Sequence, residues 1–262
     1  MILGIVASET EKAKELSKKI EKYLTQRGHE VAGERLAGAE AVFVLGGDGT
    51  LIHTACEHIA LNVPFIGINV GTLGFLAACE GDEWKSAVDK VIKGDFIVSE
   101  RMVISAEISK KETFKSLNEI TIKGMYRVID LEIAVNEQKF LDISGDGVIV
   151  STPTGSTAYS LSAGGPIVDP ELDSIIVTPI SAVGLPIPSV VLSPDDILDI
   201  HIKAGDNMFL SIDGQEHVKV SQRQNVKVEK DRYKVKFGYF DKHHFLKALN
   251  GKFGLALRAA SG

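Results

Sequence analysis

The residues best suited to chemistry stand in a glycine-rich turn, Gly46-Gly47-Asp48-Gly49-Thr50. The turn follows the apolar run Ala41–Leu45 and precedes a helical pattern that we expect to begin near Thr50. Glycines allow a tight turn and the close approach of a ligand, and a helix N-terminus favours phosphate. Asp48 would repel that phosphate unless it binds Mg²⁺ or accepts a proton from a hydroxyl. The alternative is an ordinary tight turn in which Asp48 caps the helix.

This turn differs from two common phosphate-binding motifs. No Lys-Ser/Thr pair follows it, so it is not a Walker loop. The third glycine of a dinucleotide fingerprint would fall at Ile52, so that motif is incomplete as well.

A second candidate is the run of hydroxyls and glycines between Ser144 and Pro166. Such a run can hold a polar ligand through side chains and backbone together, and Tyr159 can stack on a base. The alternative is an ordinary Ser/Gly loop between strands. Asn118-Glu119 and the Asp213-Gly214-Gln215 turn are lesser candidates, and both patterns also occur in ordinary strand starts and turns.

The elements that position the first turn alternate between strand and helix over residues 1–100. Short apolar runs predict buried strands at Ile2–Ser8, Ala41–Leu45 and Pro64–Asn69. Helical spacing predicts helices from a capping box at Ser8–Glu11 to Gly28, from about Thr50, and over Asp82–Lys93. This alternation predicts a doubly wound α/β N-terminal domain.

After about residue 100 the pattern changes to short, β-branched, alternating stretches separated by turns. It predicts a mostly antiparallel all-β domain over residues 101–240. The expected strands are Val103–Ile108, Glu119–Ile122, Ile129–Val135, Gly147–Val150, Ile175–Thr178, Ile197–Ile202, Phe209–Ile212 and Asn225–Val228. A last helix, about Asp241–Leu249, opens a C-terminal segment, residues 241–262, that can pack back on the first domain.

Composition limits the classes of partner. The chain has 262 residues, 44% apolar and 24% charged, with a net charge of −6. The negative charge argues against nucleic acid and anionic membranes, and no apolar run approaches the roughly 20 residues that span a bilayer. We interpret Cys56 and Cys79 as buried thiols in a reducing compartment. Because the opening residues also lack the basic leader of a signal peptide, we expect a cytoplasmic protein.

Four motifs in one order resemble those of the NAD kinase family. They are Gly46–Thr50, Asn69–Leu76, Asn118-Glu119 and the run Asp146-Gly…Ser151-Thr-Pro-Thr-Gly-Ser-Thr-Ala-Tyr-Ser-Leu-Ser162-Ala-Gly-Gly-Pro. The first is shared with diacylglycerol, sphingosine and phosphofructo-kinases, whereas the second and fourth are far more specific. The resemblance covers nearly the whole chain.

The resemblance implies roles for individual residues. Asp48 matches the proposed proton acceptor, and Asp48-Gly49 touch the dinucleotide. Asn118 and Glu119 match residues that bind the ribose and base, and Ser144 stands where Arg is common. The other residues implied in dinucleotide binding are His53, Arg127, Asp146, Thr157, Ala158, Tyr159, Ser160, Leu161, Ser162, Ser181 and Gln215. We assign no residue as a dedicated metal ligand, and we expect Lys227–Lys236 to be a solvated strand face and His243-His244 to be surface histidines.

The implied reaction transfers the terminal phosphoryl group of ATP to the 2′-hydroxyl of the adenosine ribose of NAD. The implied cofactors are ATP as donor, or polyphosphate in its place, and Mg²⁺ or another divalent metal. The family implies a homodimer or homotetramer. Two other readings remain: a lipid kinase that shares the glycine turn, and an NAD(P)-binding sensor without activity.

Overall fold

The protein forms two compact units in a computed structural model, which describes residues 1–71, 74–184 and 186–254. Unit 1 comprises Met1–Glu100 together with the chain from Val235 onwards, and unit 2 comprises Arg101–Lys234. The chain passes from one unit to the other within β6 (Ile97–Ile108) and again within β17 (Asn225–Tyr239). The predicted combination of an α/β part with an antiparallel β part is confirmed.

Unit 1 is built on a parallel sheet in which the strands run in the order β2-β1-β3-β4. These strands are β1 (Ile2–Ala7), β2 (Glu30–Val31), β3 (Ala41–Gly46) and β4 (Pro64–Asn69). The short β5 (Cys79–Glu80) pairs with the end of β4, and the last part of β17 pairs with its beginning.

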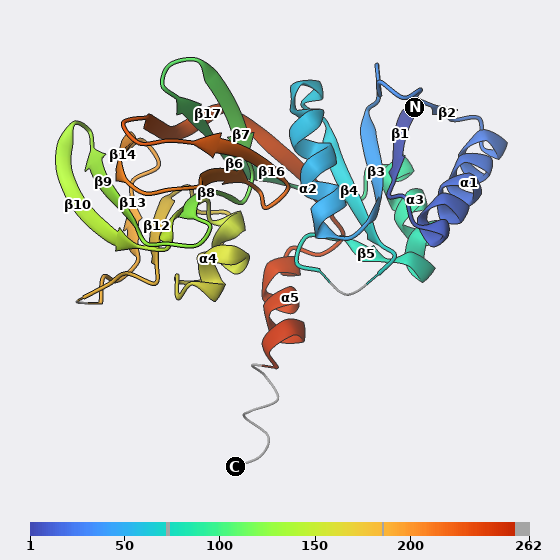
Figure 1. The fold of residues 1–262 in the computed structure, drawn as a ribbon. Coiled ribbons are helices and arrows are strands. Elements are labelled where there is room, and N and C mark those ends of the chain that lie inside the picture. Colours follow the sequence, from blue (N-terminus) through green and yellow to red (C-terminus); the bar gives the residue numbers. More distant parts are fainter. Residues whose placement is uncertain (72–73, 185, 255–262) are drawn as a thin grey trace, which may run out of the picture. The chain divides into compact units, whose positions relative to one another are not determined.

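Helices cover both faces of this sheet (Figure 1). Alternate strand residues such as Phe43, Leu45 and Ile66 pack against α1 (Glu11–Gln26) and α3 (Trp84–Lys93). On the other face, α2 (Asp48–Glu57) lies over β3 and β4, and Leu51 packs close to Gly67. Ala13, Leu16, Ile20 and Leu24 recur at helical spacing in α1 and are buried, which is why this sequence forms that helix. The short turns η1 (Ile59–Leu61) and η2 (Gly81–Glu83) complete the connections.

The strand order places the glycine turn at a switch point. The chain winds outwards in opposite directions from β1 and β3, and ligands in such sheets bind beyond the carboxyl ends of the strands at that crevice. Gly46 ends β3 at this edge, and the backbone of Ser8 bonds to Leu45 at a distance of 2.8 Å. The fold therefore presents Gly47 and Asp48 where a ligand can reach them.

Unit 2 contains two sheets. One is antiparallel, in the order β13-β12-β11-β8-β15-β16. Its strands are β8 (Glu119–Gly124), β11 (Gly147–Ser151), β12 (Ile175–Ile180), β13 (Val190–Leu192), β15 (Met208–Ile212) and β16 (Glu216–Val220). The other contains β10 (Gln138–Gly145), β9 (Ile129–Val135), β14 (Leu198–Ala204), β17, β6 and β7 (Glu112–Ser116).

Alternation along the strands divides the first of these sheets into two faces. Ile120, Ile122 and Leu210 point into the apolar core of unit 2. Glu119, Thr121 and Lys123 point to the opposite face, because successive side chains of a strand alternate. Above that face lie η3 (Thr154–Thr157) and the short helix α4 (Tyr159–Ser162).

Several predicted boundaries are wrong. The cap of α1 is Thr10, whose hydroxyl accepts from the backbone of Ala13, not Ser8. Helix α2 begins at Asp48 and not near Thr50, and α5 (His244–Phe253) begins after Asp241. Strands β2, β5, β7, β10, β13 and β16 were not predicted.

Candidate functional site

Asp48 lies in the first turn of α2 and is half-buried. Its carboxylate accepts hydrogen bonds from the backbone N–H of Phe75, at 2.6 Å, and of Leu76, at 3.1 Å. The cap position is Gly47, which has no side chain to bond with the helix. The capping role for Asp48 is therefore wrong: its carboxylate holds a neighbouring loop instead of its own helix.

That loop follows β4 and belongs to the motif Asn69–Leu76, of which Thr72 and Leu73 lie outside the described residues. The buried Asn69 side chain bonds to the backbone of Gly71 and to Glu80. Gly74 lies against the Asp48 carboxylate, and any side chain at position 74 would collide with it. The glycine is thus required by the close approach of Asp48.

His244 is not a surface residue. Its ring stacks on Tyr239, with ring centres 4.1 Å apart, and its Nε2 lies 3.0 Å from the carbonyl oxygen of Phe75. By contrast, the His53 side chain is 67% exposed and pairs with Glu57, at 3.7 Å. Gly49 is exposed beside Asp48.

In unit 2, a cavity of about 490 Å³ opens over the polar face of the sheet. This volume is within the range of small-molecule sites. Tyr159 stands at its edge, with the Lys123 ammonium 6.0 Å from the centre of the ring. The lining residues are Glu119, Thr121, Lys123, Met125, Tyr159, Phe209, Ser211, Gly214 and His217. The cavity thus combines an aromatic face, a cation and several hydrogen-bonding groups.

Glu119 is the most perturbed of the lining groups. It is only 5% exposed, and its Oε2 atom has no hydrogen-bond partner among the described residues. Burial raises the pKa of this carboxyl to about 8, and the charge of Asp213 adds to the effect. Ser151 lies opposite Glu119 in the sheet, and its buried hydroxyl also has no partner in that part of the chain. A neutral Glu119 carboxyl can donate a hydrogen bond to a ligand.

Asp213 fixes the backbone from which Asn118 and Glu119 project. Its carboxylate accepts from the Ser116 hydroxyl and from the backbone N–H of residues 117, 118 and 119, at 2.5 to 3.2 Å. Burial raises the pKa of Asp213, and these hydrogen bonds oppose that rise. The turn at Asp213 therefore holds the backbone of the Asn118-Glu119 segment in place.

Buried hydroxyls hold the loop that carries Tyr159. Thr152 donates to the carbonyl of Leu117 at 2.5 Å, and the Ser160 and Thr178 hydroxyls are 3.0 Å apart. Gly155 packs against the backbone of Asn118 so closely that a Cβ atom there would collide with it. Thr157, Ala158 and Leu161 are half-buried along this loop, and Ser162 is exposed.

Three other predicted residues, Ser144, Asp146 and Ser181, lie near the end of these strands opposite Glu119. The carbonyl of Ser144 accepts from the N–H of Val183, and the N–H of Asp146 donates to the carbonyl of Ile180. Ser144, Asp146 and Ser181 are all exposed. The Asp146 carbonyl also accepts from the N–H of Gly124, just beyond Lys123. Gln215 is exposed beside Gly214 at the cavity.

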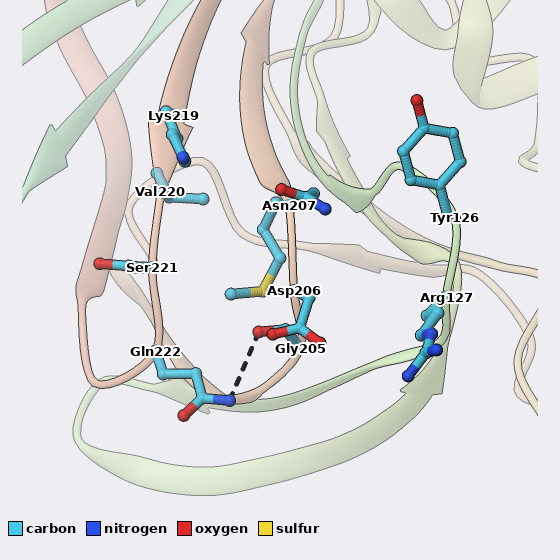
Figure 2. Close-up of a pocket in the computed structure, with 10 residues that line it drawn as sticks. Tyr126, Arg127, Gly205, Asp206, Asn207, Lys219, Val220, Ser221 and Gln222 are labelled. Atoms are coloured by element: carbon cyan, nitrogen blue, oxygen red, sulfur yellow. Dashed lines mark hydrogen bonds between the residues drawn. The ribbon is translucent and has the colours of Figure 1, made fainter.

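Arg127 lines a separate cavity of about 640 Å³ with Asp206, Asn207, Lys219 and Gln222. Figure 2 shows Tyr126 and Arg127 extending in different directions from consecutive positions. Met125 lines the Tyr159 cavity, and Arg127 lines the second cavity. The turn after β8 therefore contributes lining residues to both cavities. The structure does not bring Arg127 into the lining of the Tyr159 cavity.

Sequence reasoning missed part of the lining of the Tyr159 cavity. Thr121, Lys123, Phe209, Ser211 and His217 line the cavity without belonging to any motif. Their signal is the period-2 alternation of β8, β15 and β16, whose outward positions are polar or aromatic.

The described residues contain no group of three or more His, Cys, Asp or Glu side chains that could hold a metal ion. In the same part of the chain, no helix is long and apolar enough to cross a membrane. Burial raises the pKa of the Cys79 thiol to about 12, so it stays protonated.

Comparisons with known proteins point to the same family for the N-terminal and the C-terminal parts of the chain. Residues 3–96 match the family described as the ATP-NAD kinase N-terminal domain, and residues 117–239 match the ATP-NAD kinase C-terminal domain. An NAD kinase of Natranaerobius thermophilus is 35% identical over 249 residues, covering 89% of this chain and 87% of that protein. An NAD kinase of Clostridium botulinum is 38% identical over 235 residues, covering 87% and 83%.

Two solved structures share the fold. The yeast NADH kinase complexed with NADH superposes with a TM-score of 0.84 at 22% identity, covering 97% of this chain and 87% of that one. An NAD kinase from Archaeoglobus fulgidus in complex with ATP superposes with a TM-score of 0.78 at 24% identity, covering 95% and 98%.

Proposed function

The chain belongs to the NAD kinase family, and we propose how its residues divide the work of transferring the terminal phosphoryl group of ATP to the 2′-hydroxyl of the adenosine ribose of NAD. Unit 1 would carry the catalytic carboxylate and the donor phosphates, and unit 2 would hold the dinucleotide. The observation that carries this division is the carboxylate of Asp48, fixed by two backbone donors at the switch point of a parallel sheet.

Asp48 acts as the proton acceptor. The ribose 2′-oxygen forms a bond to the γ-phosphorus, its proton passes to the Asp48 carboxylate, and ADP leaves with the electrons of the broken P–O bond. A carboxylate has about four lone-pair positions. Among the described residues two are used, by Phe75 and Leu76, so the others can accept from the hydroxyl. Phosphoryl transfer depends mainly on positioning and on charge neutralisation, so a fixed carboxylate suits it.

A divalent metal fits this donor set. Mg²⁺ in kinases is held by one or two carboxylates together with substrate phosphates, not by a cage of protein ligands. The half-buried Asp48 beside an exposed glycine backbone could provide one such carboxylate. When bound, the metal neutralises charge on the phosphate oxygens. The residues of this chain would orient the hydroxyl and cradle the phosphates.

The acceptor site is the cavity beside Tyr159. Its size, the aromatic face and the hydrogen-bonding groups of Glu119 and Thr121 support a dinucleotide there. Asn118 and residues 157–162 would hold NAD together with them. Ser144, Asp146, Ser181 and Gln215 would make further contacts with NAD. Arg127 and His53 would also contact the substrates, although neither lines this cavity.

Asp48→Asn tests the function. The variant keeps the shape of the side chain but loses its charge and basicity, so kcat should fall roughly 10²–10⁴-fold while NAD affinity is retained. Asp95→Asn, at an exposed position after α3, is the matched control and should retain wild-type turnover. A metal role would raise the Mg²⁺ requirement and be partly rescued by excess metal. Near-normal turnover of the Asp48 variant, measured as NADP formed from ATP and NAD, would refute the assignment.

We further propose a homodimer or homotetramer in the cytoplasm. Family membership and the large apolar side chains exposed on unit 2, such as Tyr126, Leu172 and Val183, support self-association. The two thiols, without a disulfide, support a reducing compartment. A mass measurement that returns only monomer at micromolar concentration would contradict the oligomer.

A further inference from the structure

Helix α5 contacts Phe75 of the loop that holds Asp48, and both belong to unit 1. Three side chains of the helix meet Phe75. The Nε2 atom of His244 lies 3.0 Å from the Phe75 carbonyl oxygen. The ring of Phe253 lies 6.1 Å from the Phe75 ring, and the Lys252 ammonium lies 5.6 Å from it.

One peptide group joins His244 to Asp48. The carbonyl of Phe75 and the N–H of Leu76 belong to the same planar peptide unit. The carbonyl faces His244, and the N–H donates to Asp48 Oδ1 at 3.1 Å. A carbonyl oxygen only accepts, so Nε2 of His244 must carry the proton. Because the unit is rigid, the bond at one end fixes the direction of the N–H at the other.

We propose that His244 is a positioning residue for phosphoryl transfer, acting through the Phe75–Leu76 peptide to hold the Asp48 carboxylate. The inference rests on the proposed role of Asp48 as proton acceptor. It gives the C-terminal helix a part in the reaction, although His244 itself touches neither the carboxylate nor the substrate.

The sheet fixes His244 in turn. Its ring stacks nearly parallel on Tyr239, at an angle of 18°, and Tyr239 is only 4% exposed in β17. Two residues earlier, Phe237 pairs with Phe65 of β4. Hydrogen bonds in a chain polarise one another, so the bond from His244 also strengthens the N–H of Leu76 as a donor. The carboxylate is therefore oriented from the rigid sheet as well as from its own helix.

Two variants separate this role from simple packing. His244→Phe keeps an aromatic ring for Tyr239 but cannot donate to the carbonyl. His244→Gln keeps an N–H donor at a similar reach and should rescue the first variant's defect. Leu246→Ala, at a 59% exposed position of the same helix, controls for changes in α5 itself. Asp48→Asn is measured in parallel.

We expect His244→Phe to lower kcat roughly five- to tenfold, the size of one lost hydrogen bond, with KM for NAD within about twofold of wild type. His244→Gln should recover most of kcat, and Leu246→Ala should match wild type. Equal kcat in His244→Phe and wild type, or equal losses in the Phe and Gln variants, would overturn the positioning role. If Asp48→Asn keeps its turnover, Asp48 is not the proton acceptor. The positioning role of His244 is then overturned as well, because it rests on that assignment.

Discussion

Replacing Glu119 with Gln should change how the stability of the protein depends on pH. Glu119 is 5% exposed, its Oε2 is unbonded among the described residues, and its pKa is raised to about 8. The unfolded chain titrates near the ordinary value of about 4.3. Between these two values the folded state binds one more proton than the unfolded state. The contribution of Glu119 to stability is therefore complete below about pH 4 and is lost as pH rises towards 8.

The magnitude follows from the shift. One pKa unit corresponds to about 1.4 kcal/mol, so a shift from about 4.3 to about 8 corresponds to on the order of 5 kcal/mol. Glu119→Gln keeps the size and hydrogen-bonding capacity of the protonated acid but cannot ionise. The variant should exceed wild type by about 1 kcal/mol at pH 5 and by about 5 kcal/mol near pH 9.

Urea unfolding followed by circular dichroism at several pH values between 5 and 9 measures the effect, provided that the m-value is unchanged. Glu216→Gln, at an exposed position of β16, is the control and should run parallel to wild type. If the stability difference between Glu119→Gln and wild type is constant over this range, Glu119 does not titrate there. That result would refute the claim that Glu119 is protonated in the folded protein and donates a hydrogen bond to a ligand in the cavity.

Two further predictions concern the loop over the same sheet. Tyr159→Ala should weaken NAD binding by about 1–3 kcal/mol and leave ATP binding nearly unchanged, because it removes a stacked ring; unchanged NAD affinity in calorimetry would remove Tyr159 from the site. Gly155→Ala should cost about 1–3 kcal/mol of stability, because the new Cβ meets the backbone of Asn118. A thermal midpoint equal to that of wild type would show that the loop can move away from β8.

The sequence predicted the parts of the fold that rest on local signals. The strand Pro64–Asn69 and the position of the glycine turn at the end of β3 follow from short apolar runs bounded by turn residues. Strands β7 and β16 carry polar residues at most positions, so they lack such a run. These segments become strands because they pair with β6 and β15 in the folded protein, and that pairing cannot be read from their own residues.

The contacts that complete the candidate site join residues far apart in sequence. Asp213 bonds to Asn118 across 95 positions, and His244 meets Phe75 across 169. Nothing in the local pattern of either segment indicates its partner. The pair His243-His244, followed by a helical stretch, resembles a solvated helix start, and this is why the surface prediction for His244 was wrong.

Three Asp-Gly pairs in this chain illustrate how the surroundings decide what a carboxylate can do. Asp213 accepts at least four hydrogen bonds from a single short segment, so its lone pairs are used in holding Asn118 and Glu119. Asp146 is exposed, and its backbone atoms join two strands. Asp48 lies between these extremes: two backbone donors fix it, and it is exposed enough to meet a substrate. A proton acceptor needs both a fixed direction and unused lone pairs, and of these three carboxylates only that of Asp48 combines them.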